Sequence, residues 1–220
     1  MFRAVLFDVD GTLVDSNELH VDAWDEAFRH FGKQFTRAQL HEQVGKGGDN
    51  YIPSLLNAAE VQSFGDELNK FRGDIFKEKY MDRVQPFPKV RELFERIRND
   101  GKRIVLASSG NEDEIQHYIK LLNVRDVADV YTTKTDVKHS KPNPDIFARA
   151  LTLVDVSADD AVVVGDTPYD VQAAKKIDVR TIGVLCGGFP EDQLRASGAI
   201  AIFHDPADLL ENYTRSPLCG

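Results

Sequence analysis

The sequence predicts an α/β fold, a doubly wound and mainly parallel sheet with an inserted all-α domain. Short apolar segments bounded by turns alternate with stretches of helical periodicity, which is typical of parallel strands joined by crossover helices. Between the first two apolar segments, residues 16–83 show helical periodicity and no convincing strand. Two aspartates, Asp8 and Asp10, directly follow the first apolar segment. In an open α/β sheet, that carboxyl edge is where ligands bind.

Six apolar segments are predicted to be strands. They are residues 3–7, 103–107, 127–132, 161–164, 180–184 and 199–203. Helical patterns separate the later strands, as the spacing of apolar residues in 90–97 illustrates. Right-handed crossovers through such helices produce a mainly parallel sheet.

Two helix starts carry local signals. Asn111 is followed three residues later by Glu114, which predicts a capped helix beginning there. Asn143 and Pro144 are predicted to be the cap and the first helical residue of the next helix.

The segment 16–83 is predicted to be a separate helical domain, which we call the cap. It is too long for a plain crossover between two strands. Trp24 and Phe28 lie at helical spacing in its first helix, and Leu68 lies in a later one. We therefore expect an α/β core of residues 1–15 and 84–220, a cap of residues 16–83, and hinges at 14–17 and 81–88.

Composition limits the classes of binding partner that the protein can have. The 220 residues have a formal net charge of −9, which argues against a nucleic-acid backbone or an anionic membrane as the main partner. No apolar run approaches the roughly 18 residues that a membrane span needs, and no signal peptide is evident at the N-terminus. Cys186 and Cys219 form neither a disulfide framework nor a metal-ligand spacing. We expect a cytoplasmic protein, monomeric or weakly homodimeric.

The two aspartates after the first strand predict a cation site. Neighbouring carboxylates repel each other, so they persist where a cation or a proton lies between them. Asp8 and Asp10 are followed at once by a turn at Gly11 and Thr12. The local chemistry therefore indicates a Mg²⁺ site that carries a nucleophile or an acid/base group.

Four segments in order resemble the haloacid-dehalogenase-like phosphohydrolases. The first has two aspartates after a strand, the second is an apolar strand ending in serine, the third is a Lys-Pro pair, and the fourth is a strand followed by two acids. These segments are residues 7–16, 104–109, 140–142 and 162–170. Together they cover the chain nearly end to end, and they most resemble the phosphoglycolate-phosphatase and β-phosphoglucomutase group with a helical cap.

The resemblance implies roles for three aspartates. Asp8 would be the nucleophile that forms an aspartyl-phosphate. Asp10 would be the general acid/base, which calls for a raised pKa in its acid role. Mg²⁺ would be held by Asp8, the backbone carbonyl of Asp10 and Asp166. The presence of an acidic residue at position 10 favours phosphate monoester chemistry over dehalogenation.

The resemblance also assigns the groups around the phosphate. Ser108 would donate a hydrogen bond to a phosphoryl oxygen, helped by the backbone N–H groups of Ser109 and Gly110. Lys141 would place a positive charge against Asp8 and the phosphate. Asp170 would either hold a metal-bound water or orient Lys141.

Substrate selection is expected from the cap. The glycine-rich stretch 44–50 resembles the cap loop of phosphoglycolate-phosphatase-like proteins. Lys46 in it would contact an anionic group of the substrate, although a solvated lysine in a flexible loop is the simpler alternative. His20 is expected to be a structural histidine.

The hypothesis is a Mg²⁺-dependent phosphatase acting on a small phosphorylated metabolite. A phosphosugar mutase resembling β-phosphoglucomutase and a pyrophosphatase are alternatives within the same fold. A metal-dependent glycosyltransferase would explain the Asp8 and Asp10 pair but not Ser108, Lys141 and the two later acids. A non-catalytic regulatory module would be favoured by loss of a catalytic residue, and all of them are present.

Overall fold

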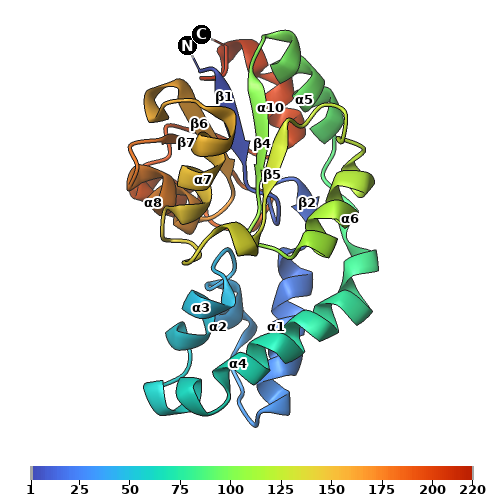
Figure 1. Cartoon of the computed structure of the whole chain (residues 1–220), viewed down its shortest axis with the longest axis vertical. Coiled ribbons are helices and arrows are strands. Elements are labelled where there is room, and N and C mark those ends of the chain that lie inside the picture. The colour runs from blue at the N-terminus through green and yellow to red at the C-terminus, as the bar shows by residue number, and fades with distance from the viewer. Residues whose placement is uncertain (1, 220) are drawn as a thin grey trace.

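A six-stranded parallel sheet forms the core of the protein, with the cap helices below it (Figure 1). The computed structural model describes residues 2–219. The strand order is β5-β4-β1-β6-β7-β8, and each pair of neighbours is parallel. The bounds are β1 Ala4–Phe7, β4 Arg103–Ala107, β5 Val130–Thr132, β6 Ala161–Gly165, β7 Arg180–Val184 and β8 Ala201–Phe203. The predicted α/β fold with a mainly parallel sheet is confirmed.

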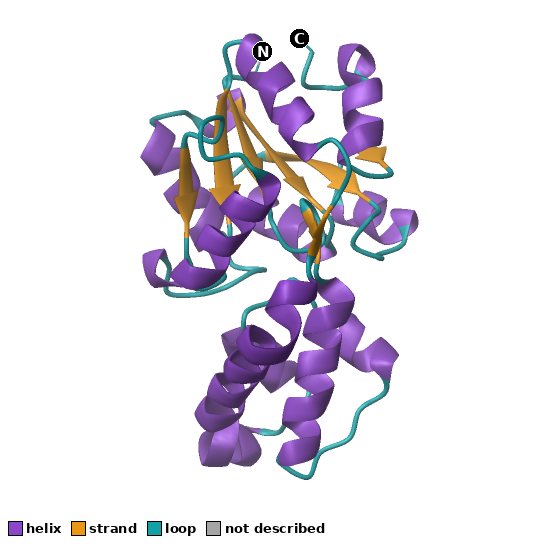
Figure 2. Cartoon of the chain, turned by 90° about the vertical axis from the view of Figure 1, so that its right-hand side faces the viewer, coloured by secondary structure: helices purple, strands orange, loops and turns teal. Residues whose placement is uncertain are grey.

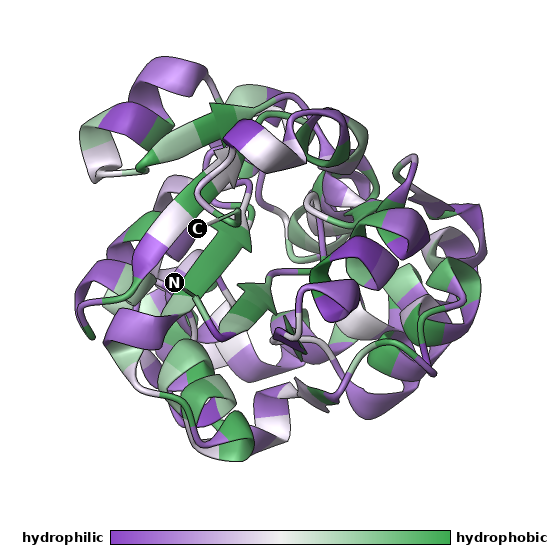
Figure 3. Ribbon diagram, turned by 90° about the horizontal axis from the view of Figure 1, so that it is seen from above, coloured by the Kyte–Doolittle hydropathy of each residue, from purple (hydrophilic) through white to green (hydrophobic). Residues whose placement is uncertain are grey.

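Helices cover both faces of this sheet. Because successive side chains of a strand point to opposite faces, Val5 and Phe7 of β1 pack with the cluster containing α5, while Ala4 and Leu6 pack with the cluster containing α7. The apolar strands occupy the middle of the core in the view from above (Figure 3). The core helices are α5 Val90–Asn99, α6 Glu112–Leu122, α7 Asp145–Val154, α8 Pro168–Lys175, α9 Glu191–Ser197 and α10 Pro206–Glu211.

One of the two predicted helix starts is correct. Asn111 is the N-cap of α6, and its backbone N–H donates to the Glu114 carboxylate at 3.3 Å. The other prediction is wrong by one residue, because α7 begins at Asp145 and Pro144 occupies the cap position. The Asn143 side-chain amide donates to the Ser140 carbonyl at 3.0 Å, and the helix has no side-chain cap.

The cap helices pack around an apolar cluster of their own. The bounds are α1 Asn17–His30, α2 Arg37–His41, α3 Gly48–Tyr51 and α4 Ala58–Ile75, and a π-helical segment, Phe76–Tyr80, continues α4. Trp24 stacks on Tyr51 with 4.1 Å between the ring centroids, and Leu68 is fully buried beside them. These elements lie within residues 16–83, and the division of the chain into core and cap at these bounds remains a prediction.

The two connections between core and cap pair with each other. β2, Val14–Asp15, and β3, Gln85–Pro86, form a small antiparallel sheet. The sequence predicts hinges there and no strand, since two residues are too short for a periodic pattern. Figure 2 shows the helical part joined to the sheet part at this narrow region. Within residues 2–219, no helix is both long and apolar enough to cross a membrane.

Phe94 of α5 supports the strand that carries Asp8. Its ring is fully buried, 4.8 Å from the ring of Phe7 between centroids. We expect Phe94→Ala to lower the free energy of unfolding by about 3–5 kcal/mol because it leaves a cavity, whereas Phe94→Leu should cost less than about 1.5 kcal/mol. Urea denaturation measures both values. Equal and small losses in the two variants would contradict this role.

Candidate active site

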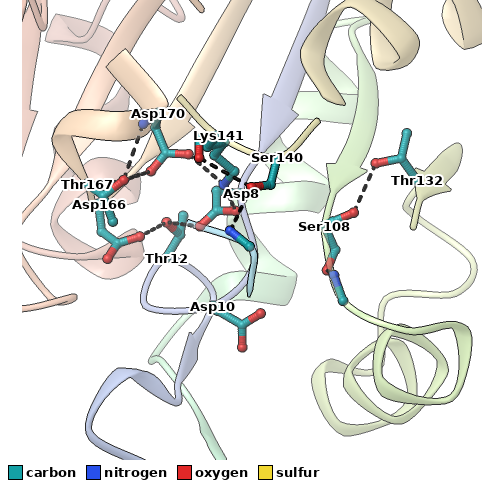
Figure 4. A network of polar contacts seen from close by, with 12 residues as sticks. Asp8, Asp10, Thr12, Ser108, Thr132, Ser140, Lys141, Asp166, Thr167 and Asp170 are labelled. Carbon is teal, nitrogen blue, oxygen red and sulfur yellow. Dashed lines mark hydrogen bonds and ion pairs between the residues drawn. The ribbon is translucent and has the colours of Figure 1, made fainter. Parts of the chain in front are cut away.

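Four buried charged residues meet at the carboxyl edge of the sheet (Figure 4). Asp8 directly follows β1 and Asp166 directly follows β6. These strands are neighbours with Phe7 opposite Val164, so both aspartates lie at the same edge of the sheet, with Asp166 one residue further along its strand. Asp170 lies in the first turn of α8, and Lys141 comes from the loop before α7.

Lys141 joins two of these acids. Its Nζ donates to Asp8 Oδ1, and to Asp170 Oδ1 at 2.7 Å. The lysine is 2% exposed. Burial alone would lower the pKa of Lys141, but Asp170 and Asp8 together raise that pKa. The side chain is therefore a buried ammonium group held between two carboxylates.

Asp170 is itself fixed by the start of its helix. Its Oδ2 accepts hydrogen bonds from the Thr167 backbone N–H at 3.0 Å and the Thr167 hydroxyl at 2.7 Å. The Thr167 hydroxyl in turn accepts from the Asp170 backbone N–H, which forms a capping box. Both carboxylate oxygens of Asp170 thus have protein partners, an arrangement that suits the orientation of Lys141.

Asp166 has two partners from the beginning of the chain. Thr12 donates its hydroxyl to Oδ1 at 2.8 Å, and Asn17 donates its amide to Oδ2 at 2.9 Å. The carboxylate packs directly against Gly187, where a Cβ atom would lie 1.7 Å from Asp166 Oδ2. Only glycine fits beside this acid, which gives the Gly187 loop a role that the sequence did not predict.

The acid cluster has the donors that a divalent cation requires. Oxygens of Asp8, Asp166 and Asp170 all lie within 4.8 Å of one another. Three carboxylates and one ammonium leave two negative charges in a buried site, and a divalent cation would balance them. Burial raises the pKa of Asp8 well above its ordinary value despite the opposing effect of Lys141. Oxygen-only ligands fit Mg²⁺, so the residues present suit the predicted ion.

Asp10 belongs to a second polar group on the cap side. Its Oδ1 accepts from the Ser16 hydroxyl at 2.6 Å and lies 3.0 Å from His20 Nε2. Burial opposes ionisation of Asp10, but His20 and Ser16 outweigh it and lower the pKa of Asp10. The sequence predicts a raised pKa here, and that prediction is wrong because these partners stabilise the carboxylate.

His20 and Glu114 are site residues that sequence reasoning missed. His20 contacts Asp10, stacks on Phe76 with 3.9 Å between ring centroids, and lies 3.9 Å from Glu114 Oε1. His20 also lines the cavity, and its expected structural role remains a prediction. Burial raises the pKa of Glu114, and the Asp10 carboxylate adds to this shift. The capping pattern at Asn111 marked Glu114 only as a helix-start residue.

A cavity of about 830 Å³ separates the core from the cap. Asp8, Asp10 and Lys141 line it from the core. Among the described residues, Ser109 lines the cavity but Ser108 does not. Ser108 is buried and accepts a hydrogen bond from the Gly110 N–H at 3.0 Å, and it stands apart from Asp8 in Figure 4. The phosphate-binding roles of both serines remain predictions.

Lys46 lines the same cavity from the cap but already has partners. Its Nζ donates to Gln43 Oε1 at 2.6 Å and to the Ser54 hydroxyl at 3.0 Å, and it lies 4.6 Å from the centre of the Tyr169 ring. Burial lowers the pKa of Lys46. Its contact with a substrate remains a prediction.

The glycine-rich cap loop docks on the residue before Lys141. The Gly47 N–H donates to the Ser140 hydroxyl at 2.9 Å, and the Asn50 amide donates to the Ser140 carbonyl at 3.0 Å. In the other direction, the Ser140 N–H donates to Asp49 Oδ2 at 3.0 Å. These contacts hold the cap loop against the core.

Fold and site together define an α/β protein with a buried carboxylate cluster facing a helical cap. Residues 5–184 match the family described as "Haloacid dehalogenase-like hydrolase". The chain belongs to this family, and the resemblance inferred from its four motifs is confirmed.

Relatives and solved structures agree with this assignment. A "Phosphorylated carbohydrates phosphatase" from Thermotoga maritima is 29% identical over 91% of this chain and 93% of its own. A "Putative pyrophosphatase PpaX" from Caldanaerobacter subterraneus subsp. tengcongensis is 27% identical over 94% and 93%. A hydrolase structure from Pseudomonas syringae superposes with a TM-score of 0.87 at 26% identity, covering 96% of this chain and 98% of that one. A putative β-phosphoglucomutase from Bacteroides vulgatus gives 0.81 at 25% identity, covering 96% and 87%.

The buried acids predict an unusual pH dependence of stability. Burial and Asp170 raise the pKa of Asp166 from 3.8 to about 7. The folded protein then holds this proton more tightly than the unfolded chain, so its contribution to the free energy of unfolding falls as the pH rises between about 4 and 7. In chelator, we expect the wild type to lose about 1–3 kcal/mol more than Asp166→Asn between pH 5 and 8.

Urea denaturation of both proteins at the two pH values measures this difference. Excess Mg²⁺ should shrink it, because a cation that binds the ionised folded form stabilises that form. Parallel pH profiles for wild type and Asp166→Asn in chelator would show that the acid does not titrate as described.

Proposed function

We propose that this protein is a Mg²⁺-dependent phosphatase that hydrolyses a small phosphorylated metabolite through an aspartyl-phosphate. The observation that carries the proposal is Lys141 held between Asp8 and Asp170, with Asp166 beside them and Asp10 on the cavity side. This arrangement offers a nucleophile, a fixed positive charge and a separate acid/base group. Family membership and relatives named as phosphatases support the same chemistry.

The reaction has two halves. In the first, an Asp8 oxygen attacks phosphorus, a new P–O bond forms, and the bond to the leaving alcohol breaks while Asp10 gives that oxygen a proton. In the second, Asp10 takes a proton from water, the water oxygen attacks phosphorus, and Asp8 is released with inorganic phosphate. The lowered pKa of Asp10 suits this residue to its role as proton acceptor in the second half. Lys141 stabilises negative charge in both halves.

Mg²⁺ would be held by the carboxylates of Asp8 and Asp166 and the backbone carbonyl of Asp10. When bound, the ion supplies positive charge that neutralises the phosphoryl oxygens. Thr12 and Asn17 orient Asp166 for this task through the hydrogen bonds already described.

Pyrophosphate hydrolysis is the second candidate. It is favoured by relatives named as pyrophosphatases that match this chain over most of its length. It needs the same residues with a phosphate as the leaving group. A phosphosugar mutase differs in returning the phosphoryl group to the sugar. A panel of phosphomonoesters, pyrophosphate and hexose 1-phosphates separates the three by the product formed.

Asp8→Asn tests the nucleophile. We expect it to lower Mg²⁺-dependent phosphate release by at least about a thousandfold, since an amide cannot form the acyl-phosphate, and chelator should abolish release by the wild type. Phosphate release across the panel measures this. The exposed Asp82 of the cap provides the control Asp82→Asn, expected to match the wild type. Release that survives Asp8→Asn would rule out the proposed mechanism.

Ser140 and Asn50 test the docking of the cap loop. Each of Ser140→Ala and Asn50→Ala should raise KM by about 3- to 10-fold, the value of one or two neutral hydrogen bonds. The double variant should lose less than the sum of the two single losses, because the Asn50 amide also donates to the Ser140 hydroxyl at 3.0 Å and either substitution removes that bond. Steady-state kinetics measures this cycle, with the exposed Ser63→Ala as control. Fully additive losses would show that the two residues act independently.

A further inference from the structure

Arg72 of α4 reaches the cavity without a polar partner. It lines the cavity, and its guanidinium carbon lies 4.8 Å from the centre of the Trp24 ring. Its Nε is buried and has no hydrogen-bond partner. Buried donors of native proteins are almost always paired, so this guanidinium lacks an acceptor that a ligand can provide.

The other cap cations along the cavity are already engaged. Lys70 donates to Asp74 at 2.8 Å, Lys77 donates to Asp113 at 2.7 Å, and Lys46 has the two partners given above. Among the described residues of the cap, Arg72 is the one cavity-lining cation that makes neither an ion pair nor a side-chain hydrogen bond. Its positive charge is therefore free to meet an incoming anion.

The position of Arg72 matches the leaving-group side of the proposed reaction. Phe76 follows it by one helical turn, so both side chains lie on one face of the helix. Phe76 stacks on His20, which contacts Asp10. Since Asp10 would face the leaving oxygen in the proposed reaction, a leaving group that extends past His20 and Phe76 would reach Arg72.

Glu114 is an acid whose pKa responds to the charge of Arg72. The guanidinium lowers the pKa of Glu114, although less than burial and Asp10 raise it. No carboxylate oxygen of the described residues lies within ion-pair distance of Arg72. Arg72 thus acts on Glu114 only through its charge, and the hydrogen-bond donors of Arg72 are not used by Glu114.

We propose that Arg72 binds a second anionic group, a carboxylate or a phosphate, at the far end of the leaving group. The inference rests on the proposed phosphatase function and deepens it. The preferred substrate is then a small phosphomonoester with a second oxyanion, ahead of a neutral sugar phosphate. A planar guanidinium suits such a group because it can donate two parallel hydrogen bonds to it.

Esters of matched length test this specificity. The probes are 2-phosphoglycolate, 2-hydroxyethyl phosphate and ethylene glycol bisphosphate, which differ in a terminal carboxylate, hydroxyl or phosphate. We expect the wild type to favour at least one anionic ester over the neutral one by about tenfold or more in kcat/KM. Whichever anionic ester is better identifies the terminal group. Equal kcat/KM for all three would overturn the proposal.

Variants of Arg72 show whether the preference depends on this side chain. Arg72→Gln should remove the preference through KM while leaving kcat/KM for the neutral ester within about twofold, and Arg72→Lys should restore part of it. The control is Arg29→Gln, which removes an exposed cap cation paired with Asp25 outside the cavity lining. A loss of the same size for neutral and anionic esters in Arg72→Gln would assign Arg72 a structural role and overturn the proposal.

A binding measurement separates this inference from the proposed hydrolysis. Trp24 is the sole tryptophan, so intrinsic fluorescence reports directly on the ring beneath Arg72. In Asp8→Asn, 2-phosphoglycolate or the bisphosphate should give a saturable fluorescence change whose Kd rises about tenfold or more when Arg72→Gln is added. If no ester is hydrolysed by the wild type but this binding depends on Arg72, the phosphatase proposal fails and the anion site stands. A Kd unaffected by Arg72→Gln would overturn the site.

Discussion

The ion pairs of Lys141 are the interaction on which the rest of the site depends. Three buried carboxylates, those of Asp8, Asp166 and Asp170, meet where two neighbouring parallel strands end. Removing such charges from water costs several kcal/mol each unless they are paired. Lys141 offsets part of this cost, and the hydrogen bonds from Thr12, Asn17 and Thr167 offset more. The negative charge that remains is what the proposed Mg²⁺ would balance.

Core and cap are linked through the same lysine. The cap loop makes its hydrogen bonds to Ser140, one residue before Lys141. Movement of that loop would therefore act on the backbone that aims the ammonium group at Asp8. The paired connections β2 and β3 lie directly before the cap helices begin and after they end. The position of the cap is therefore linked to that of Lys141 and its partner Asp8 by short, direct contacts.

The sequence predicted what is encoded locally. Apolar runs ending in Asp8, Ser108 and Asp166 located three strands and the edge of the sheet, because burial on both faces requires continuous apolar residues. His20, Glu114 and Arg72 were not recognised as site residues, since helices α1, α6 and α4 bring them together only when the cap lies over the core. The lowered pKa of Asp10 was missed for the same reason, as it depends on His20. The start of α7 was misplaced by one residue because the helix begins after Pro144 without a side-chain cap.

A chain with a net charge of −9 can bind an anion only where local cations outweigh the overall field. Lys141 lies on the core side of the cavity, balanced by the acids that fix it, and Arg72 lies on the cap side with no acid paired to it. The two positive groups therefore have different proposed roles. In the proposed reaction, the charge of Lys141 acts on the phosphoryl group that every substrate carries. The charge of Arg72 has no paired acid among the described residues of the free protein. Only a substrate that carries a second anion would offset the free-energy cost of removing this guanidinium from water. Selectivity of this kind follows from an unpaired donor in the cap and leaves the chemistry of the core unchanged.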